Sequence, residues 1–452
     1  MIQKIPEIIQ DIYKKVEAAG FQIYIVGGGV RDILMDKPVK DWDLATNAIP
    51  EEILKIFPDS FYDNKFGTVG IPVEINSEKQ VVEITTFRTE RGYKDRRHPE
   101  AVEWGKTIEE DLARRDFTIN SISMKLSTPI GFIDPYNGQR DIKEKLIRAV
   151  GNPKERFKED ALRLMRAIRF ATQLSFSIET NTWVEITKDA SLIKEISAER
   201  IRDELLKILA SENPFEGINL LKNSGLLEQI IPELLEGIGV SQARPGRHHT
   251  TDVYDHNLLT LKYCPSHDPI VRLASLLHDI GKPKVRANDE EDLVIFHNHE
   301  MVSARMAKEI AERLKLSRKD KEKVVGLIRW HMFTVDEHIT DAAVRRFIRR
   351  VGVNNVKDIV DLRIGDRLGS GTATAESWRL KLFKKRIEDQ FKPKPFSIED
   401  MAVNGNDVMK ALDIPPGKKV GEILEKLFEE VDEDLSKNTR EYLLDRIKKT
   451  AN

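Results

Sequence analysis

Residues 24–46 read Tyr-Ile-Val-Gly-Gly-Gly-Val-Arg-Asp-Ile-Leu-Met-Asp-Lys-Pro-Val-Lys-Asp-Trp-Asp-Leu-Ala-Thr, and this stretch decides the fold. The apolar run from Phe21 to Val26 predicts a buried strand. Gly27 and Gly28 follow it, and glycine lets a backbone approach a bulky anionic ligand because it has no Cβ. Arg31 comes next, and its planar guanidinium group suits phosphate. The stretch therefore predicts a phosphate-binding turn after a buried strand.

Two carboxylates follow this turn. Asp41 and Asp43 flank Trp42, and alternate side chains of an extended segment share a face. Carboxylates held together repel each other unless a cation lies between them. Mg²⁺ takes one or two carboxylates and completes its shell with phosphate oxygens and water, so it is the expected ion. Alone, each feature also fits an ordinary turn or a solvated loop.

A third acidic residue lies in the run Val81–Phe87, which predicts a strand. Glu83 is its only charged residue. Two interpretations stay open. The plainer one, which is slightly favoured, is that Glu83 faces solvent or lies on an edge strand. The other is that Glu83 is a third carboxylate beside Asp41 and Asp43.

The patterns G-G-x-x-R-D and K-D-x-D-x-A-T in residues 24–46 resemble the nucleotidyltransferases related to DNA polymerase β. More narrowly, they resemble the class II tRNA nucleotidyltransferases, which include CCA-adding enzymes, and the bacterial poly(A) polymerases. The spacing of neither the P-loop nor the Rossmann fingerprint is present. The resemblance implies that Asp41 and Asp43 hold Mg²⁺, that Gly27, Gly28 and Arg31 position phosphates, and that a third carboxylate can come from a neighbouring strand.

A second pattern, R-R-D-F-T-I-N, occupies Arg114–Asn120 within residues 109–124. We expect a helix there, with Leu112, Phe117, Ile119 and Ile122 packed inward. An arginine and an aspartate in a nucleotide site can bind ribose hydroxyls and so reject a sugar without the 2′-hydroxyl, because a buried polar group is then left unpaired. The resemblance places ribose selection on Arg115 and Asp116, with Asn120 nearby; a surface salt-bridge helix is the alternative.

A third pattern, E-D-A-L-R, lies within residues 156–170, which we expect to form one helix. Asp160 and Arg163 are three residues apart and would share a face, as an ordinary ion pair also would. The resemblance to the E-D-x-x-R motif implies that they select the base. Cytosine and adenine both present an amino donor beside a ring-nitrogen acceptor, so one carboxylate and one guanidinium can accept either. Arg166 and Arg169 extend this nucleotide-binding stripe. Glu159 is expected to hold the base-selecting side chains in position. The helix expected at residues 196–209 resembles one that braces this motif, and we assign it structure only.

Residues 88–104 are too charged for a core and predict a solvated loop. The segment also resembles the flexible loop that positions the terminal nucleotide in CCA-adding and A-adding enzymes. Enzymes that add only C typically lack this loop.

A separate group of histidines and aspartates lies in the second half of the chain. Imidazole and carboxylate groups are good ligands for divalent metals, and a site closed by several helices can activate water. The set resembles the HD phosphohydrolase motif, with a second metal position in some members. The implied ligands are His256, His278, Asp279, His299, His331 and Asp366. The resemblance implies a divalent transition metal or Mg²⁺ at this site, while His248, His249 and His267 are expected at the surface.

The bulk composition fits this organisation. At 452 residues, with 40% hydrophobic and 33% charged residues, the chain is long enough for about three domains. The net charge of −2 restricts any RNA-binding surface to a local patch. The arginines at 345, 346, 349 and 350 form either a solvated helix face or such a phosphate-tracking stripe. With one cysteine, no signal peptide and no apolar run of about 18 residues, we expect a cytoplasmic protein without membrane contact.

We therefore expect an α+β nucleotidyltransferase head of the polymerase β type with a mixed sheet, followed by a predominantly all-α neck, HD body and tail. The expected boundaries are 1–145 for the head, 146–235 for the neck, 236–370 for the body and 371–452 for a tRNA-binding tail. The expected function is addition of CCA to tRNA 3′ ends from CTP and ATP, without a nucleic-acid template and with no protein partner evident. The alternatives are an A-adding enzyme, a poly(A) polymerase, or a protein that is mainly an HD phosphohydrolase.

Overall fold

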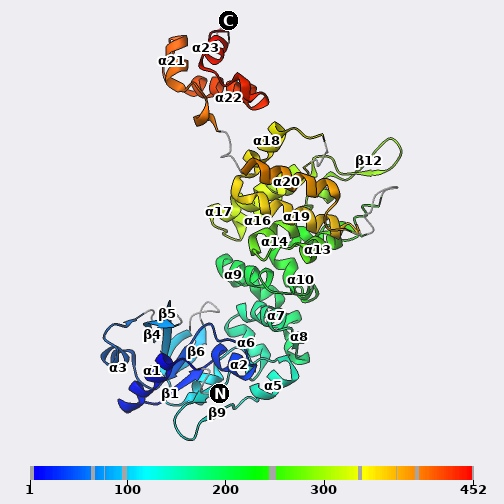
Figure 1. Ribbon diagram of the computed structural model, residues 1–452. Helices are drawn as coiled ribbons and strands as arrows, with labels where there is room; N and C mark the ends of the chain where they lie inside the picture. Colours follow the sequence, from blue (N-terminus) through cyan, green and yellow to red (C-terminus); the bar gives the residue numbers. More distant parts are fainter. Residues whose placement is uncertain are drawn as a thin grey trace.

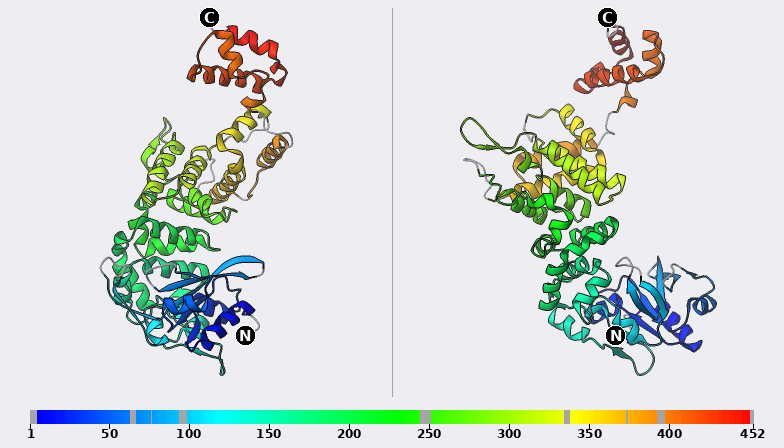
Figure 2. Two further views of the ribbon diagram at one scale, coloured as in Figure 1. Left: turned by 90° about the vertical axis from the view of Figure 1, so that its left-hand side faces the viewer. Right: turned by 180° about the vertical axis from the view of Figure 1, so that it is seen from behind.

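The chain is elongated, with a sheet-containing head at one end and a small helical unit at the other (Figures 1 and 2). The computed structural model describes residues 5–62, 67–75, 77–93, 99–243, 251–333, 338–372, 374–391 and 397–449. Helices stack between the two ends. Among the described helices, none combines the length and the apolar character needed to cross a bilayer.

The head is built on a seven-stranded sheet in the order β3-β4-β5-β2-β1-β8-β9. β2 pairs with β5 in parallel, whereas β1 pairs with β2 and β8 in antiparallel fashion, so the sheet is mixed as expected. The strands are β1 (Ile23–Val26), β2 (Asp43–Thr46), β3 (Phe61–Tyr62), β4 (Thr68–Ile75), β5 (Glu78–Thr86), β8 (Ser123–Lys125) and β9 (Gly131–Ile133).

Apolar side chains of the first helix explain how the sheet is covered. α1 (Glu7–Ala18) buries Ile9, Ile12 and Val16, which recur at helical spacing. These side chains pack in one cluster with Ile25 and residues of the neighbouring strands. The predicted buried strand before Gly27 is therefore confirmed.

The charged segment 88–104 differs from the expected loop. β6 (Arg88–Tyr93) and β7 (Pro99–Trp104) pair as an antiparallel hairpin. Ladder hydrogen bonds join backbone groups, so a charged composition does not prevent pairing. Residues 94–98, at the centre of the predicted loop, lie outside the described residues.

Both helices predicted over the second and third patterns are interrupted. α4 (Ile108–Ala113) ends before the R-R-D-F sequence, and the 3₁₀-helix η2 (Thr118–Asn120) follows it. The third pattern, E-D-A-L-R, divides between α6 (Pro153–Glu159) and α7 (Leu162–Leu174), because Asp160 is extended and its Oδ1 accepts from the backbone N–H of Leu162 at 3.0 Å. Burial of Leu112, Phe117, Ile119 and Ile122 is confirmed.

The neck and the body share one apolar core, which extends from Phe117 to Leu362. α7 packs against α9 (Ala198–Leu209), and α9 packs against α14 (Pro269–Leu277) in the body. The other main body helices are α13 (Val253–Tyr263), α16 (His299–Arg313), α17 (Arg318–Trp330), α18 (Asp341–Val351), α19 (Val356–Gly369) and α20 (Trp378–Phe391).

The last helices form a unit with a core of their own. α22 (Lys418–Glu433) packs with α21 (Gly405–Leu412) and α23 (Arg440–Lys449) around an apolar cluster. The remaining helices and strands are α2 (Gly28–Leu34), α3 (Pro50–Ile56), α5 (Gly138–Glu144), α8 (Thr180–Asp189), α10 (Pro214–Asn223), α11 (Leu226–Ile230), α12 (Pro232–Leu235), α15 (Lys282–Val285), β10 (Leu146–Ile147), β11 (Ser177–Ile178), β12 (Ala287–Asn288), β13 (Val294–Ile295), η3 (Ala190–Glu195), η4 (Val353–Asn355), η5 (Ile398–Asp400) and η6 (Leu435–Lys437).

Candidate functional site

The glycine turn after β1 lies directly against charged side chains. Gly27 has a φ of 71°, a conformation that side chains disfavour. A Cβ added to Gly27 would lie 2.8 Å from Nη1 of Arg115 and 3.7 Å from Oδ2 of Asp43. Glycine at this position therefore leaves space beside a guanidinium group and a carboxylate.

The carboxylate pair lies at the start of β2. Trp42 is buried, with 5% exposure. Of its two neighbours in the sequence, Asp41 is exposed and Asp43 is half-buried. Burial raises the pKa of Asp43, the charge of Arg115 lowers it, and the charge of Asp41 raises it; the net direction is upward. The charge of Asp41 thus adds to burial in disfavouring the ionised form of Asp43, and a divalent cation would relieve this.

Glu83 lies opposite Asp43 in the parallel register of β2 and β5. Its side chain is exposed, as the favoured interpretation expected. The expected edge strand is wrong, because β5 lies between β4 and β2 inside the sheet.

A cavity of about 1060 Å³ opens between the head and the neck. It is lined by all twelve residues predicted for the nucleotide and carboxylate sites other than Glu83, which are Gly27, Gly28, Arg31, Asp41, Asp43, Arg115, Asp116, Asn120, Asp160, Arg163, Arg166 and Arg169. Arg88, Arg114, Phe170 and Arg200 also line it. The cavity therefore joins an acidic end to a wall rich in guanidinium groups.

Hydrogen bonds orient the arginines near the glycine turn. Arg31 donates from Nη1 to Oδ1 of Asn120 at 2.8 Å and from Nε to Asp32 at 2.9 Å. Arg115 donates from Nη2 to the fully buried carboxylate of Asp111 at 2.9 Å. These contacts hold both guanidinium groups on the cavity wall.

Asp116 connects this region to α7. Its carboxylate accepts from Nε of Arg166 at 2.8 Å and from Nδ2 of Asn120 at 3.1 Å. Burial opposes its ionisation, but the charge and hydrogen bonds of Arg166 lower the pKa of Asp116 to about 2. Asp116 is therefore an ionised acceptor that orients both neighbours.

The two residues predicted to select the base are not paired with each other. Arg163 donates from Nη1 to Oε2 of Glu159 at 2.8 Å, consistent with a holding role for Glu159. Asp160 accepts from Nη2 of Arg200 at 2.7 Å and from its Nη1 at 3.2 Å. Both side chains line the cavity, Asp160 from the break between α6 and α7 and Arg163 from the first turn of α7.

Arg200 is one of the cavity residues that were not predicted, and it contacts a predicted one directly. It lies on α9, to which we assigned structure only, although its bidentate contact with Asp160 reaches the cavity. The bracing role expected for α9 is also visible, because Glu204 lies 3.0 Å from Nε of Arg169. The E-R-I pattern around Arg200 was the available signal.

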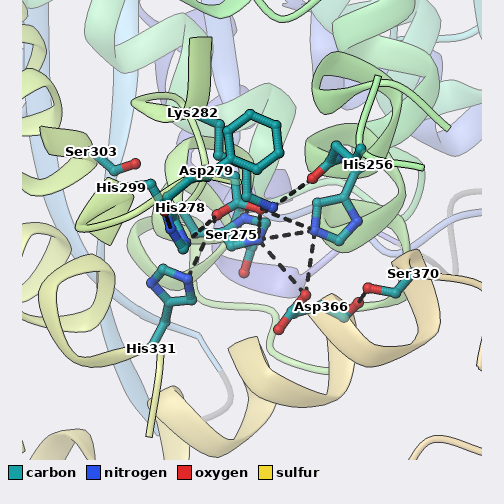
Figure 3. A network of polar contacts seen from close by, with 12 residues as sticks. His256, Ser275, His278, Asp279, Lys282, His299, Ser303, His331, Asp366 and Ser370 are labelled. Carbon is teal, nitrogen blue, oxygen red and sulfur yellow. Dashed lines mark hydrogen bonds and ion pairs between the residues drawn. The ribbon is translucent and has the colours of Figure 1, made fainter. Parts of the chain in front are cut away.

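A second centre lies in the body, where Figure 3 shows four imidazole rings around two carboxylates. His256 comes from α13, and His278 and Asp279 directly follow α14. The other members are the first residue of α16, the residue after α17 and one residue of α19: His299, His331 and Asp366. All six predicted ligands are buried together.

Asp279 is shared by two groups of ligands. Its Oδ2 lies 3.3 Å from Nε2 of His256 and 3.3 Å from Nε2 of His278. Its Oδ1 lies 3.2 Å from Nε2 of His299 and 3.6 Å from Nε2 of His331. On the first side, Asp366 Oδ1 lies 3.3 Å from Nε2 of His256.

The ionisation of Asp279 and His331 suits metal ligation. Burial opposes charge on Asp279, but the nearby His278 and Lys282 hold the pKa of its carboxyl well below the usual range. Burial and the neighbouring His278 lower the pKa of His331 to about 3. An ionised carboxylate and a neutral imidazole are the forms that bind metal.

Two other imidazoles of the centre hold protons more tightly. Burial disfavours the charged forms of His256 and His299, but hydrogen bonds with Asp279 raise the pKa of both, that of His256 to about 9. A bound metal would therefore displace protons from these two rings.

The remaining histidine predictions are settled only in part. His267 is exposed, as expected, and lies 3.3 Å from Nη2 of Arg272. His248 and His249 lie outside the described residues.

Comparison with known proteins gives matches over most of the chain. The family described as Poly A polymerase head domain matches residues 23–148, Probable RNA and SrmB- binding site of polymerase A matches 175–237, and HD domain matches 253–366. The CCA-adding enzyme of Ligilactobacillus salivarius is 33% identical over 455 residues, covering 99% of this chain and 98% of that protein. The CCA-adding enzyme of Geobacillus thermodenitrificans is 43% identical over 226 residues, about half of each protein (50% and 54%).

A solved structure also matches along nearly the whole length. The crystal structure of Bacillus stearothermophilus CCA-adding enzyme in complex with CTP has a TM-score of 0.72 and 25% sequence identity, covering 97% of this chain and 96% of that one. A complex of a CCA-adding enzyme with ATP has a TM-score of 0.64 at 20% identity, covering 100% and 97%, and shows similarity of fold.

Proposed function

Because this chain belongs to the family of CCA-adding enzymes, we propose that the cavity between its head and neck adds C, C and A to the 3′ end of tRNA, using CTP and ATP. The observation that best supports this is a single cavity lined both by the carboxylate pair Asp41 and Asp43 and by the base-selecting candidates Asp160 and Arg163. The RNA 3′-hydroxyl oxygen forms a bond to the α-phosphorus of the nucleotide, and the bond to pyrophosphate breaks.

Asp41 and Asp43 are the residues that would hold Mg²⁺ in this reaction. When bound, Mg²⁺ lowers the pKa of the attacking hydroxyl and neutralises charge on the triphosphate. The raised pKa of Asp43, to which burial and the charge of Asp41 contribute, fits such an ion. Glu83 is a candidate third carboxylate on the neighbouring strand.

Guanidinium groups supply the other positive charge. Arg31 is oriented by Asn120, and Gly27 leaves the backbone open, so both can approach a phosphate group. Arg115 and Asp116 are the candidates for contacts to the ribose hydroxyls. Arg166 and Arg169 extend the same wall along α7.

Base selection follows from the fixed positions of Asp160 and Arg163. Arg200 holds the carboxylate of Asp160 as an acceptor, and Glu159 holds Arg163 as a donor. Cytosine and adenine can each donate an amino hydrogen to Asp160 and accept from Arg163. A carbonyl oxygen of uracil or guanine would face the carboxylate instead, which disfavours both.

The test of this function uses purified protein and tRNA that lacks its terminal CCA. With each nucleotide supplied singly and then in combination, we expect incorporation of C first and of A only after C. Addition of A alone to such tRNA would instead support an A-adding enzyme or a poly(A) polymerase. Incorporation is measured by gel electrophoresis of labelled product.

A substitution at Asp160 tests the selection of the base. Asp160→Asn replaces one acceptor oxygen by a donor, so we expect kcat/KM for CTP and ATP to fall and discrimination against UTP to narrow by about 10- to 200-fold. Values of kcat/KM for the four nucleotides separate selection from general damage. Asp203→Asn is the matched control, because Asp203 is an exposed acid on α9 paired with Arg202. An unchanged CTP-to-UTP ratio in Asp160→Asn would exclude Asp160 from base selection.

The body supports a second candidate activity, hydrolysis of phosphomonoesters or 2′,3′-cyclic phosphates. The specific observation is the carboxylate of Asp279 between two groups of imidazoles. The six buried ligands fit one or two divalent transition metal ions or Mg²⁺, which activate water when bound. Lys282 contacts Asp279 and donates to Oε1 of Gln242 at 2.5 Å, so it also holds this carboxylate in place.

We further propose a cytoplasmic protein that meets tRNA, CTP and ATP as its partners. For its organisation we keep the division into head (1–145), neck (146–235), body (236–370) and tail (371–452). The neck and the body share one continuous apolar core, so we expect them to behave as one rigid unit.

A further inference from the structure

The joint between the body and the last helices is centred on one buried carboxylate. Asp432 lies on α22, and its side chain is only 1% exposed. Its Oδ1 accepts from Nε of Arg345 at 2.6 Å, and its Oδ2 accepts from Nη2 of Arg349 at 2.8 Å. Nη2 of Arg345 also donates to the backbone oxygen of Asp432 at 2.8 Å. We call these three residues the ionic clamp.

The clamp joins three helices. Arg345 and Arg349 are one turn apart on α18, so they share a face. Arg345 also donates from Nη1 to Oε1 of Gln390 on α20 at 3.1 Å. Arg349 lies 4.7 Å from the ring centre of Phe428, one turn before Asp432 on α22. Two of the four arginines expected to face solvent or RNA phosphates therefore bind Asp432 instead.

In the described part of the chain, the apolar cluster of the last helices contains no residue of the body. Its members lie between Met401 and Ile447. An apolar interface tolerates small rotations, whereas hydrogen bonds from two guanidinium groups to one carboxylate are directional. The orientation of residues 397–449 relative to the body thus depends on polar contacts.

We infer that Asp432 is a positioning residue: the ionic clamp sets the orientation of residues 397–449 on the body and thereby the fit of an RNA that extends along the chain. The head and these last helices lie at opposite ends of the molecule (Figure 2), so a change of angle at the clamp displaces one end relative to the other. The effect of the clamp on the fit of an RNA rests on the proposed function, the addition of CCA to tRNA.

The charge state of Asp432 agrees with this role. Burial disfavours its ionised form, but the hydrogen bonds from Arg349 and Arg345 lower its pKa. Asp432 therefore stays ionised at neutral pH. Removing one partner of a buried ion pair leaves the other groups without their charge partner.

The experiment compares Asp432→Asn with the full-length wild type by small-angle X-ray scattering and by kinetics. We expect a changed scattering profile and a larger radius of gyration. We also expect KM for full-length tRNA to rise about fivefold or more with kcat unchanged. KM for a short hairpin that ends in the same acceptor stem should stay the same. A purely structural defect would lower activity on both RNAs.

Glu430→Gln is the matched control. Glu430 lies two residues from Asp432, but it accepts from Nε of Arg446 at 2.8 Å and from the hydroxyl of Tyr442 at 3.2 Å, both within the last helices. It should leave the scattering profile and both KM values unchanged. Arg349→Met serves as the second variant if Asp432→Asn melts below the assay temperature, as followed by circular dichroism.

An unchanged scattering profile in folded Asp432→Asn or Arg349→Met would overturn the inference. Equal effects on the long and the short RNA would also overturn it. If the wild type extends neither RNA, the proposed function fails, while the scattering comparison still tests the clamp.

Discussion

Asp43→Asn is expected to lower the rate of nucleotide addition by roughly 10³-fold or more, which corresponds to about 4 kcal/mol of lost transition-state stabilisation. Asp43 is the more buried of the two carboxylates, and its Oδ2 faces the open side of Gly27. An amide oxygen lacks the negative charge that balances Mg²⁺. Nucleotide affinity should change less than the rate, because the arginines and Asp160 remain.

Rates are measured under single-turnover conditions with tRNA lacking its terminal A and with ATP in excess. Asp59→Asn is the control, since Asp59 is an exposed acid of the same head that does not line the cavity. It should add A at the wild-type rate. If Asp43→Asn retained more than about a tenth of the wild-type rate, the carboxylate pair would not be the catalytic centre.

The head could be predicted from short-range patterns. The run before Gly27 is apolar at every position from Ile23 to Val26, and all four residues are buried. In the strands around Val69 and Ile84, the apolar residues Val69, Ile71, Val82 and Ile84 are buried. Apolar segments of this kind are expected to be buried. Exposing their side chains to water would cost far more free energy than local conformational preferences supply.

The partners of the two residues proposed to select the base could not be predicted in this way. Helical spacing joined Asp160 to Arg163, but Asp160 breaks the helix by capping α7 and binds Arg200, forty residues later. Spacing arguments apply only within one element. A contact between two helices depends on how they pack, which the local pattern of charges does not contain.

The same limit explains the arginines of α18. Their spacing predicted a shared face, and Arg345 and Arg349 do share one. Their common partner Asp432 lies 87 residues from Arg345. The sequence therefore predicted the direction of these side chains but not what they bind.

The histidine centre was more predictable, because its ligands are unusual residues in apolar helices. His278 and Asp279 follow a helix whose members Leu273–Leu277 are all buried. A buried histidine–aspartate pair needs polar partners. The sequence suggested few other roles for the remaining predicted ligands. Their sharing of one carboxylate, with one oxygen toward each group, became visible only in three dimensions.

Asp279→Asn is accordingly expected to weaken divalent metal binding in the body by more than about 100-fold, since even residues that only orient metal ligands contribute 10- to 100-fold. It removes charge from both groups of imidazoles at once. Combining it with Lys282→Met avoids leaving the buried ammonium group of Lys282 without its carboxylate. Metal content after dialysis against Mn²⁺ or Ni²⁺ is measured by mass spectrometry, and affinity is measured by calorimetry.

The control for this experiment is Asp255→Asn, which changes an exposed acid beside His256 that belongs to neither group. It should bind metal like the wild type. Addition of CCA by the Asp279 double variant should also be normal, because its head–neck cavity is unchanged. Loss of phosphatase or cyclic phosphodiesterase activity together with metal would assign hydrolysis to the body. Full metal occupancy in the double variant would show that Asp279 is not the shared ligand, because neither group would then depend on its carboxylate.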